Sequence, residues 1–62
     1  MRIIVKFKNR SYTKYYEDVY TYYIKKEQDK SCLIIEYVAK DGKYTREWTK
    51  IDLEEVDYYE IF

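Results

Sequence analysis

The stretch that decides the fold is residues 33–50, which reads L-I-I-E-Y-V-A-K-D-G-K-Y-T-R-E-W-T-K. Two runs rich in β-branched and aromatic residues flank Asp41-Gly42, and an Asp-Gly pair between such runs is a strong signal for a β-hairpin. The type I′ turn that joins such strands needs a positive φ at both central residues, which Asp tolerates and Gly adopts freely. The sequence therefore predicts a hairpin with a two-residue turn at Asp41-Gly42.

A two-residue turn predicts which side chains of this hairpin point inward. It places Ile35 opposite Trp48 and Tyr37 opposite Arg46, and aromatic–aliphatic pairs across strands contribute roughly 0.2–1 kcal/mol each. Because alternate residues of a strand share a face, the inner face would collect the apolar residues Leu33, Ile35, Tyr37, Ala39, Tyr44 and Trp48.

One feature of this register is unfavourable, and a second register competes with it. The two-residue turn sets Glu36 opposite Glu47, a like-charge pair. A type I turn followed by a bulge at Gly42 would instead pair Glu36 with Arg46. A one-residue slip turns a strand's side chains to the other face, so only one register can be native.

The composition predicts a single small domain over residues 1–62. A chain of this length buries only about 60% of its unfolded surface, so its margin of stability is thin. One Gly and no Pro argue against linkers, while ten Tyr, two Phe and one Trp suit half-buried sheet faces. Cys32 is the single cysteine, and no signal peptide or membrane-spanning run is visible. We therefore expect a reduced, cytoplasmic setting, with Cys32 as a small strand residue.

Charge is balanced overall but unevenly distributed. The chain carries 12 basic and 12 acidic residues. Residues 1–16 contain basic residues and no acid, whereas residues 51–62 contain acidic residues and no base. Either the first and last strands are neighbours that attract each other, or the surface is bipolar. We favour neighbouring strands, because small domains often bring their termini together.

The order of apolar and polar residues predicts an all-β fold. Alternation over residues 1–8 and β-rich runs at 11–16, 19–26, 33–40, 43–50 and 57–62 predict five to six short antiparallel strands in a meander. A polar turn is expected at 27–30, and a short helical turn near residues 52–56 capped by Asp52. The strands would form a small barrel or two packed sheets. The predicted core is Ile3, Val5, Phe7, Tyr16, Tyr22, Ile24, Leu33, Ile35, Tyr37, Trp48, Leu53, Val56, Tyr59 and Ile61.

Residues 1–26 and 31–62 resemble each other and predict an internal repeat of strand, turn, strand and strand. K-N-R-S-Y-T-K at 8–14 matches K-D-G-K-Y-T-R at 40–46, and E-D-V-Y-T-Y-Y-I at 17–24 matches E-E-V-D-Y-Y-E-I at 54–61. A two-residue turn at Asn9-Arg10 would pair residues 3 with 16, 5 with 14, and 7 with 12. These pairs mirror the two-residue register of the second hairpin and favour it.

The chain lacks the groups that most enzymes use. It has no His, no Gly-rich phosphate loop, no Cys-x-x-Cys pair and no nucleophile–base arrangement. The acidic residues near position 54 match no calcium-loop spacing. We therefore expect neither catalysis, nor a cofactor, nor a metal.

The number of Tyr residues exceeds what so small a core can hold, and this favours a protein-binding role. Exposed Tyr brings contact area at low entropic cost, and an acidic end can meet a basic partner. The candidate interface is Tyr12, Tyr15, Tyr20, Tyr23, Tyr44, Tyr58, Asp52, Glu54, Glu55 and Asp57. One form of this hypothesis is self-association, with the chain as a structural subunit of a homo-oligomer.

A nucleic-acid-binding barrel is the alternative, because basic residues alternate with Tyr as in proteins that bind single strands. Its candidate face is Lys6, Lys8, Arg10, Lys14, Lys25 and Lys26. Zero net charge argues against this alternative, since nucleic-acid binders are usually basic.

Three segments carry a resemblance that spans the chain: R-I-I-V-K-F-K at 2–8, Y-V-A-K-D-G-K-Y at 37–44 and L-E-E-V-D-Y-Y-E-I-F at 53–62. In strand and turn pattern the chain resembles small uncharacterised β proteins encoded by phages and mobile elements of low-GC Gram-positive bacteria. Arg10 departs from the Gly expected in the first turn. The resemblance implies an accessory protein that acts by binding, as an inhibitor of a host defence or replication protein. It implies no particular functional residues.

Overall fold

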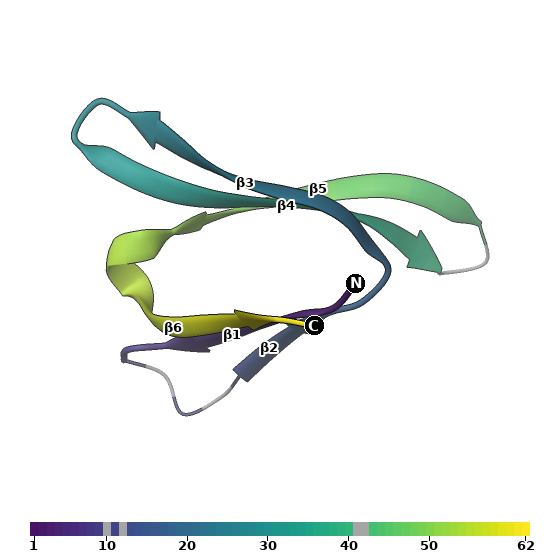
Figure 1. Ribbon diagram of the computed structural model, residues 1–62, viewed down its shortest axis with the longest axis horizontal. Coiled ribbons are helices and arrows are strands. Elements are labelled where there is room, and N and C mark those ends of the chain that lie inside the picture. Colours follow the sequence, from purple (N-terminus) through teal and green to yellow (C-terminus); the bar gives the residue numbers. More distant parts are fainter. Residues whose placement is uncertain (10, 12, 41–42) are drawn as a thin grey trace.

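The computed structural model describes residues 1–9, 11, 13–40 and 43–62, and these form two three-stranded antiparallel sheets (Figure 1). One sheet has the order β2-β1-β6, with β1 at Ile3–Phe7, β2 at Thr13–Tyr16 and β6 at Val56–Ile61. The other has the order β3-β4-β5, with β3 at Val19–Glu27, β4 at Lys30–Lys40 and β5 at Tyr44–Asp52. The predicted all-β fold is confirmed, and the sheets do not close into a barrel.

The first and last strands are neighbours, as the uneven charge distribution predicted. In the antiparallel pair β1–β6, Ile3 lies opposite Ile61 and Val5 opposite Tyr59. The pairing continues beyond the strands, since the N–H of Arg2 donates to the carbonyl of Phe62 at 3.1 Å and the N–H of Phe62 donates to that of Arg2 at 2.8 Å. Both ends of the described chain therefore lie in the same sheet.

The first hairpin has the predicted register. Ile3 lies opposite Tyr16 and Val5 opposite Lys14. The third predicted pair of that hairpin involves Tyr12, and its turn includes Arg10, so these two predictions fall outside the described residues.

The second hairpin has neither of the two predicted registers. Lys40 pairs with Tyr44, so three residues separate the strands where a two-residue turn was expected, and Glu36 lies opposite Trp48. The physical reason is burial: this register sets Ile51 opposite Leu33 on the inner face and turns Tyr44 and Trp48 outward. It also removes the Glu36–Glu47 opposition. The predicted type I′ turn itself lies on residues 41 and 42, outside the described residues.

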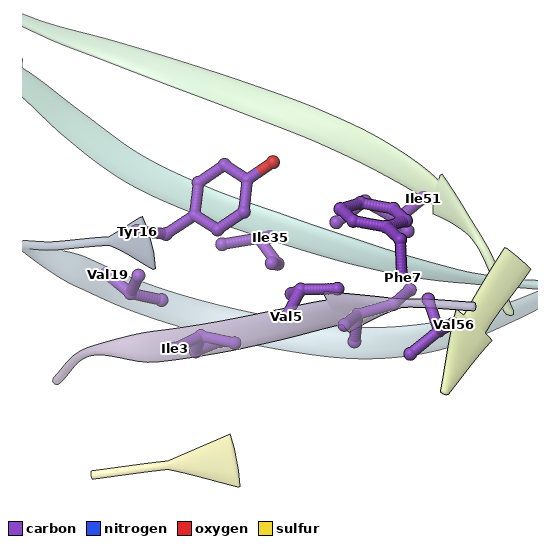
Figure 2. Close-up of a cluster of buried hydrophobic side chains, with 9 residues drawn as sticks. Ile3, Val5, Phe7, Tyr16, Val19, Ile35, Ile51 and Val56 are labelled. Atoms are coloured by element: carbon purple, nitrogen blue, oxygen red, sulfur yellow. The ribbon is translucent and has the colours of Figure 1, made fainter. Parts of the chain in front are cut away.

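The core lies between the sheets (Figure 2) and confirms half of the predicted list. The predicted residues that are buried are Ile3, Val5, Phe7, Tyr16, Leu33, Ile35 and Val56. Tyr37, Leu53 and Tyr59 pack against them while partly exposed. The prediction is wrong for Tyr22, Ile24, Trp48 and Ile61, which are exposed, and it missed Val19, Cys32, Ile34 and Ile51, which are buried.

Tyr22 and Ile24 are exposed because β3 is an edge strand, so one side of each residue meets solvent. Both residues have inward parity, and their partners Ile35 and Leu33 on the central strand β4 are fully buried. Ile34 is buried for the opposite reason. It sits on the outer face of the central strand β4, where Tyr23 and Lys50 flank it from the two neighbouring strands.

The corner between β2 and β3 joins the two sheets. Asp18 turns the chain there with a φ of 55°, a left-handed conformation that Asp adopts more readily than most residues. The N–H of Val19 donates to the carbonyl of Met1 at 3.0 Å, and the N–H of Val38 donates to that of Asp18 at 3.1 Å. Lys40 Nζ lies 3.1 Å from Asp18 Oδ2, so backbone and side chain both hold this corner.

The predicted helical turn is also confirmed. It is the 3₁₀ turn η1 at Leu53–Glu55, which links β5 to β6. Asp52 Oδ1 accepts a hydrogen bond from the N–H of Glu54 at 3.0 Å, which is the capping role expected of Asp52. Within the described ranges, no helix has the length and apolar character needed to span a bilayer.

The two halves of the chain have the same connectivity. In each half the first strand is central in one sheet, the second strand is an edge of that sheet, and the third strand crosses to form an edge of the other sheet. Strands β1, β2 and β3 thus correspond to β4, β5 and β6. The internal repeat remains a prediction, and this equivalence is the structural feature that a repeat would produce.

Candidate protein interface

The outer face of the β3-β4-β5 sheet carries a group of exposed aromatic side chains. Tyr23 lies opposite Ile34, and Trp48 lies opposite Glu36, one step along the same face of the sheet. Trp48 is 65% exposed, and Tyr20 and Tyr23 are exposed as well. We call Tyr20, Tyr23, Ile34 and Trp48 the aromatic face.

A bulge in β3 allows Tyr20 to join this face. The pairing with β4 shifts between Val19, which points into the core, and Thr21, which lies opposite Glu36 on the outer side. The extra residue leaves Tyr20 on the outer side too, where its hydroxyl donates to Glu36 Oε1 at 3.1 Å. Bulges commonly re-aim a side chain in this way.

Neighbouring groups hold the Tyr20 ring in place. The guanidinium carbon of Arg46 lies 5.4 Å from the ring centroid, within the range of a cation–π contact. Loss of solvent around the ring, and after it the hydrogen bond to Glu36, raises the pKa of the Tyr20 phenol above its usual 10.0. At neutral pH the hydroxyl therefore stays protonated and available as a donor.

A hollow of about 220 Å³ opens between Tyr23, Ile34 and Trp48. Four charged residues line the rest of it: Lys25, Glu27, Glu36 and Lys50. Lys50 Nζ lies 2.8 Å from Glu27 Oε2, and Lys25 Nζ lies 3.5 Å from Glu27 Oε1. The hollow therefore has an apolar floor and a rim of side chains that already hold one another.

The ion pairs of the rim shift the titration of its members. The hydrogen bond from Lys50 lowers the pKa of Glu27 below its ordinary value of 4.5. The same bond raises the pKa of Lys50 above its ordinary 10.5. Both groups are charged at neutral pH, so the rim keeps its arrangement there.

A second hollow of about 390 Å³ continues toward the tip of the β3–β4 hairpin. It is lined by Glu27, Gln28, Lys30, Cys32, Lys50 and Asp52. Its wall is mostly charged, unlike the apolar wall that small-molecule sites usually have. Cys32 is buried beneath these side chains with a free thiol, as expected of a small strand residue. Within the part of the chain that the structure describes, no three His, Cys, Asp or Glu residues are grouped to hold a metal ion.

The predicted interface residues are dispersed over the molecule. Tyr20 and Tyr23 lie together on the aromatic face, but Tyr15 and Tyr58 lie on the outer face of the other sheet, opposite Ile4 and Lys6. Tyr44 is 81% exposed at the start of β5. The acidic members surround the η1 turn and the start of β6, and they are Asp52, Glu54, Glu55 and Asp57. Tyr12 lies outside the described residues.

Sequence reasoning missed Trp48 as a surface residue. The residue was assigned to the core because the expected register placed it opposite Ile35. The like-charge opposition of Glu36 and Glu47 in that register was the one signal in the sequence that could have turned Trp48 outward.

The predicted nucleic-acid face is divided in the same way. Lys6 lies on the outer face of the β2-β1-β6 sheet, and Lys25 lies on the outer face of the other sheet. Lys26 is adjacent to Lys25 in β3 and has the opposite parity. Lys14 Nζ lies 5.9 Å from the ring centroid of Tyr16, and Lys8 follows the end of β1. Arg10 lies outside the described residues, and the other five do not share one surface.

In comparisons with known proteins, no family model, no curated protein and no solved structure matches this chain.

Proposed function

We propose that this protein is a non-catalytic protein-binding module that holds a protein partner against the aromatic face. The observation that carries the proposal is the exposed indole of Trp48 beside Tyr20 and Tyr23. Trp and Tyr dominate the binding energy of protein interfaces and cluster near their centres. An exposed Trp also leaves apolar surface in water, which a docked partner would cover.

The dimensions of the hollow support a protein partner over a small molecule. Its volume of about 220 Å³ is below the range of about 300–1,000 Å³ that is usual for small-molecule sites. A single large side chain projecting from a partner suits a space of this size. The rim charges of Glu27 and Lys50 would then border the contact, as polar rims do in protein interfaces.

The rim also makes binding less costly in entropy. Ordering a long side chain on association costs about 0.5–1.5 kcal/mol. Lys50, Lys25 and Arg46 already contact Glu27 or Tyr20 in the free protein, so part of that ordering has occurred before binding.

The proposed partner is a host protein. The resemblance to small proteins of phages and mobile elements implies an accessory factor in the bacterial cytoplasm, acting on a defence or replication protein. Because the module carries no His and no nucleophile–base arrangement, we propose that it acts by occupying the surface of that partner.

Capture from lysate with matched variants tests the proposal. Immobilised protein is exposed to nuclease-treated lysate of a low-GC Gram-positive bacterium, in parallel with Trp48→Ala and Tyr44→Ala. Trp48→Ala is expected to lose a specifically captured protein by tenfold or more, because central Trp residues typically contribute 2 kcal/mol or more. Tyr44→Ala removes a more exposed aromatic residue on the same side of the sheet, at the start of β5 and outside the hollow, and is expected to retain the captured protein.

Two outcomes contradict the proposal. One is equal capture of the same protein by the wild type and by folded Trp48→Ala. The other is salt-sensitive retention of nucleic acid when the nuclease is omitted, with no protein partner, which would favour the nucleic-acid alternative.

A further inference from the structure

The edge of β3 is protected at its two ends but not in its middle. The bulge between Val19 and Thr21 and the bonds from Val19 to Met1 lie at one end, and a charged stretch, Lys25 to Glu27, lies at the other. β3 is the outermost strand of the β3-β4-β5 sheet, and its residues 19–24 read V-Y-T-Y-Y-I, with no charge and no Pro. Natural edge strands are usually short, charged, bulged away or covered. On the opposite edge of the same sheet, β5 carries Arg46, Glu47 and Lys50.

Large apolar side chains are exposed on both sides of this edge. Tyr20 and Tyr23 lie on the outer side. Tyr22 and Ile24 lie on the inner side, opposite Ile35 and Leu33, and Ile24 is 50% exposed. Beyond Val19, which bonds to Met1, no described strand pairs with the open side of β3.

We propose that this edge pairs with the same edge of a second copy of the chain. The two β3 strands would run antiparallel about a two-fold axis, giving a dimer with one continuous six-stranded sheet. A two-fold interface uses one patch twice and so needs a self-complementary patch.

The charges that flank the uncharged run are partly self-complementary. Glu17 and Asp18 precede it, whereas Lys25 and Lys26 follow it. In an antiparallel pair, a register centred on Tyr22 sets Glu17 opposite Glu27, a like-charge pair, and sets Asp18 of each copy opposite Lys26 of the other. Opposite charges across strands stabilise such pairs. Of the four, Asp18 also contacts Lys40 and Lys25 contacts Glu27 in its own chain, while Glu17 and Lys26 are exposed.

The dimer has a consequence for the aromatic face. A two-fold axis perpendicular to the sheet keeps both outer faces on the same side. Two copies of Trp48 and Tyr23 would therefore face the same direction, on one surface that could bind two sites of a partner at once. The dimer does not depend on that partner, so a monomeric protein would leave the capture experiment unaffected.

Light scattering after size exclusion tests the dimer with a matched pair of variants. The wild type is expected to show twice the 7.8 kDa of the chain at high micromolar concentration. Ile24→Lys places a charge in the edge, where Lys blocks strand pairing, and is expected to shift the mass to that of one chain. Thr45→Lys makes the same change at an exposed position of the β5 edge and is expected to remain dimeric.

Variants that exchange charges at exposed positions test the dimer without placing a charge among apolar side chains. Lys25→Glu with Lys26→Glu is expected to weaken the dimer at least tenfold, and addition of Glu17→Lys to restore part of it. A wild type that is monomeric at every concentration overturns the proposal. So does a dimer that survives folded Ile24→Lys, or one that is lost equally in Thr45→Lys.

Discussion

The rings of Tyr16 and Tyr37 meet between the two sheets, with centroids 5.7 Å apart and planes inclined at 54°. Tyr16 comes from the edge strand β2 and Tyr37 from the central strand β4. Tilted aromatic pairs of this kind contribute about 0.5–1.5 kcal/mol beyond the area they bury. Tyr16 is only 9% exposed, so this pair closes the core at the end where the chain passes from one sheet to the other.

Tyr16→Ala is therefore expected to lower the free energy of unfolding by about 3 kcal/mol, the range found when a buried aromatic residue is truncated. In a domain this small, that loss is a large part of the total stability. Urea denaturation followed by circular dichroism measures it. The adjacent Tyr15 is exposed, and Tyr15→Ala is expected to change the value by less than about 1 kcal/mol. Equal effects of the two substitutions would contradict the placement of Tyr16 in the core.

Trp48 provides a spectroscopic test of the hairpin register, because it is the single Trp of the chain. Its exposure of 65% predicts emission close to that of a solvated indole, strong quenching by iodide, and little shift on unfolding. Trp48→Ala is expected to leave the free energy of unfolding within about 1 kcal/mol. Ile51→Ala, which truncates the buried residue opposite Leu33, is expected to cost about 2–5 kcal/mol. Blue-shifted emission that moves to the red on unfolding would instead support the register that buries Trp48.

The contrast between Trp48 and Ile51 shows where sequence reasoning stops. The runs of β-branched and aromatic residues predicted every strand, and the charge asymmetry predicted that β1 lies beside β6. Register depends on the number of residues in a turn, and three residues lie between the paired Lys40 and Tyr44 where a two-residue turn was expected. A slip of one residue is invisible to propensity, yet it exchanges the inner and outer faces of a strand.

Tyr22 and Ile24 illustrate a second limit. Their inward parity was predictable, but burial also depends on whether a strand is central or at an edge, and strand order is a tertiary property. The candidate site follows the same rule. The excess of Tyr predicted that Tyr20 and Tyr23 reach the surface, while the position of Trp48 beside them depended on the register.

The turn between β3 and β4 contains a backbone conformation that a substitution can relieve. Gln28 has a φ of 53°, and it is the first of the two residues between Glu27 and Lys30. A two-residue turn with positive φ at its first position favours Gly there. Gln28→Gly is therefore expected to raise the free energy of unfolding by about 0.5–1 kcal/mol. A residue with a Cβ in the left-handed region costs about 1–2 kcal/mol, and the greater freedom of Gly in the unfolded chain cancels part of the gain.

Asp29→Gly is the control for this turn. Asp29 has a negative φ, so Gly relieves no strain there and only makes the unfolded chain more flexible. Asp29→Gly is therefore expected to lower the free energy of unfolding by several tenths of a kcal/mol. Thermal denaturation of the two variants distinguishes them. A destabilised Gln28→Gly would show that the left-handed turn is not the conformation in solution.

The Lys50–Glu27 ion pair predicts how stability depends on pH and salt. Lys50 lowers the pKa of Glu27 in the folded chain, so below pH 4.5 the unfolded chain binds this proton first. The contribution of Glu27 to stability is thus present above pH 4.5 and is lost as the pH falls toward the lowered value. The pKa of Lys50 is raised, so its contribution is lost only as the pH rises above 10.5.

Urea titrations at pH 7 and pH 3 measure this contribution. The free energy of unfolding is expected to change less between the two pH values for Glu27→Gln than for the wild type. High salt is expected to bring the wild type closer to the variant, because exposed ion pairs are screened. Glu60→Gln removes an exposed carboxylate that forms no ion pair with any described residue, and it is expected to keep the wild-type difference. If Glu27→Gln and Glu60→Gln respond alike, the ion pair on the rim of the aromatic face does not form in solution.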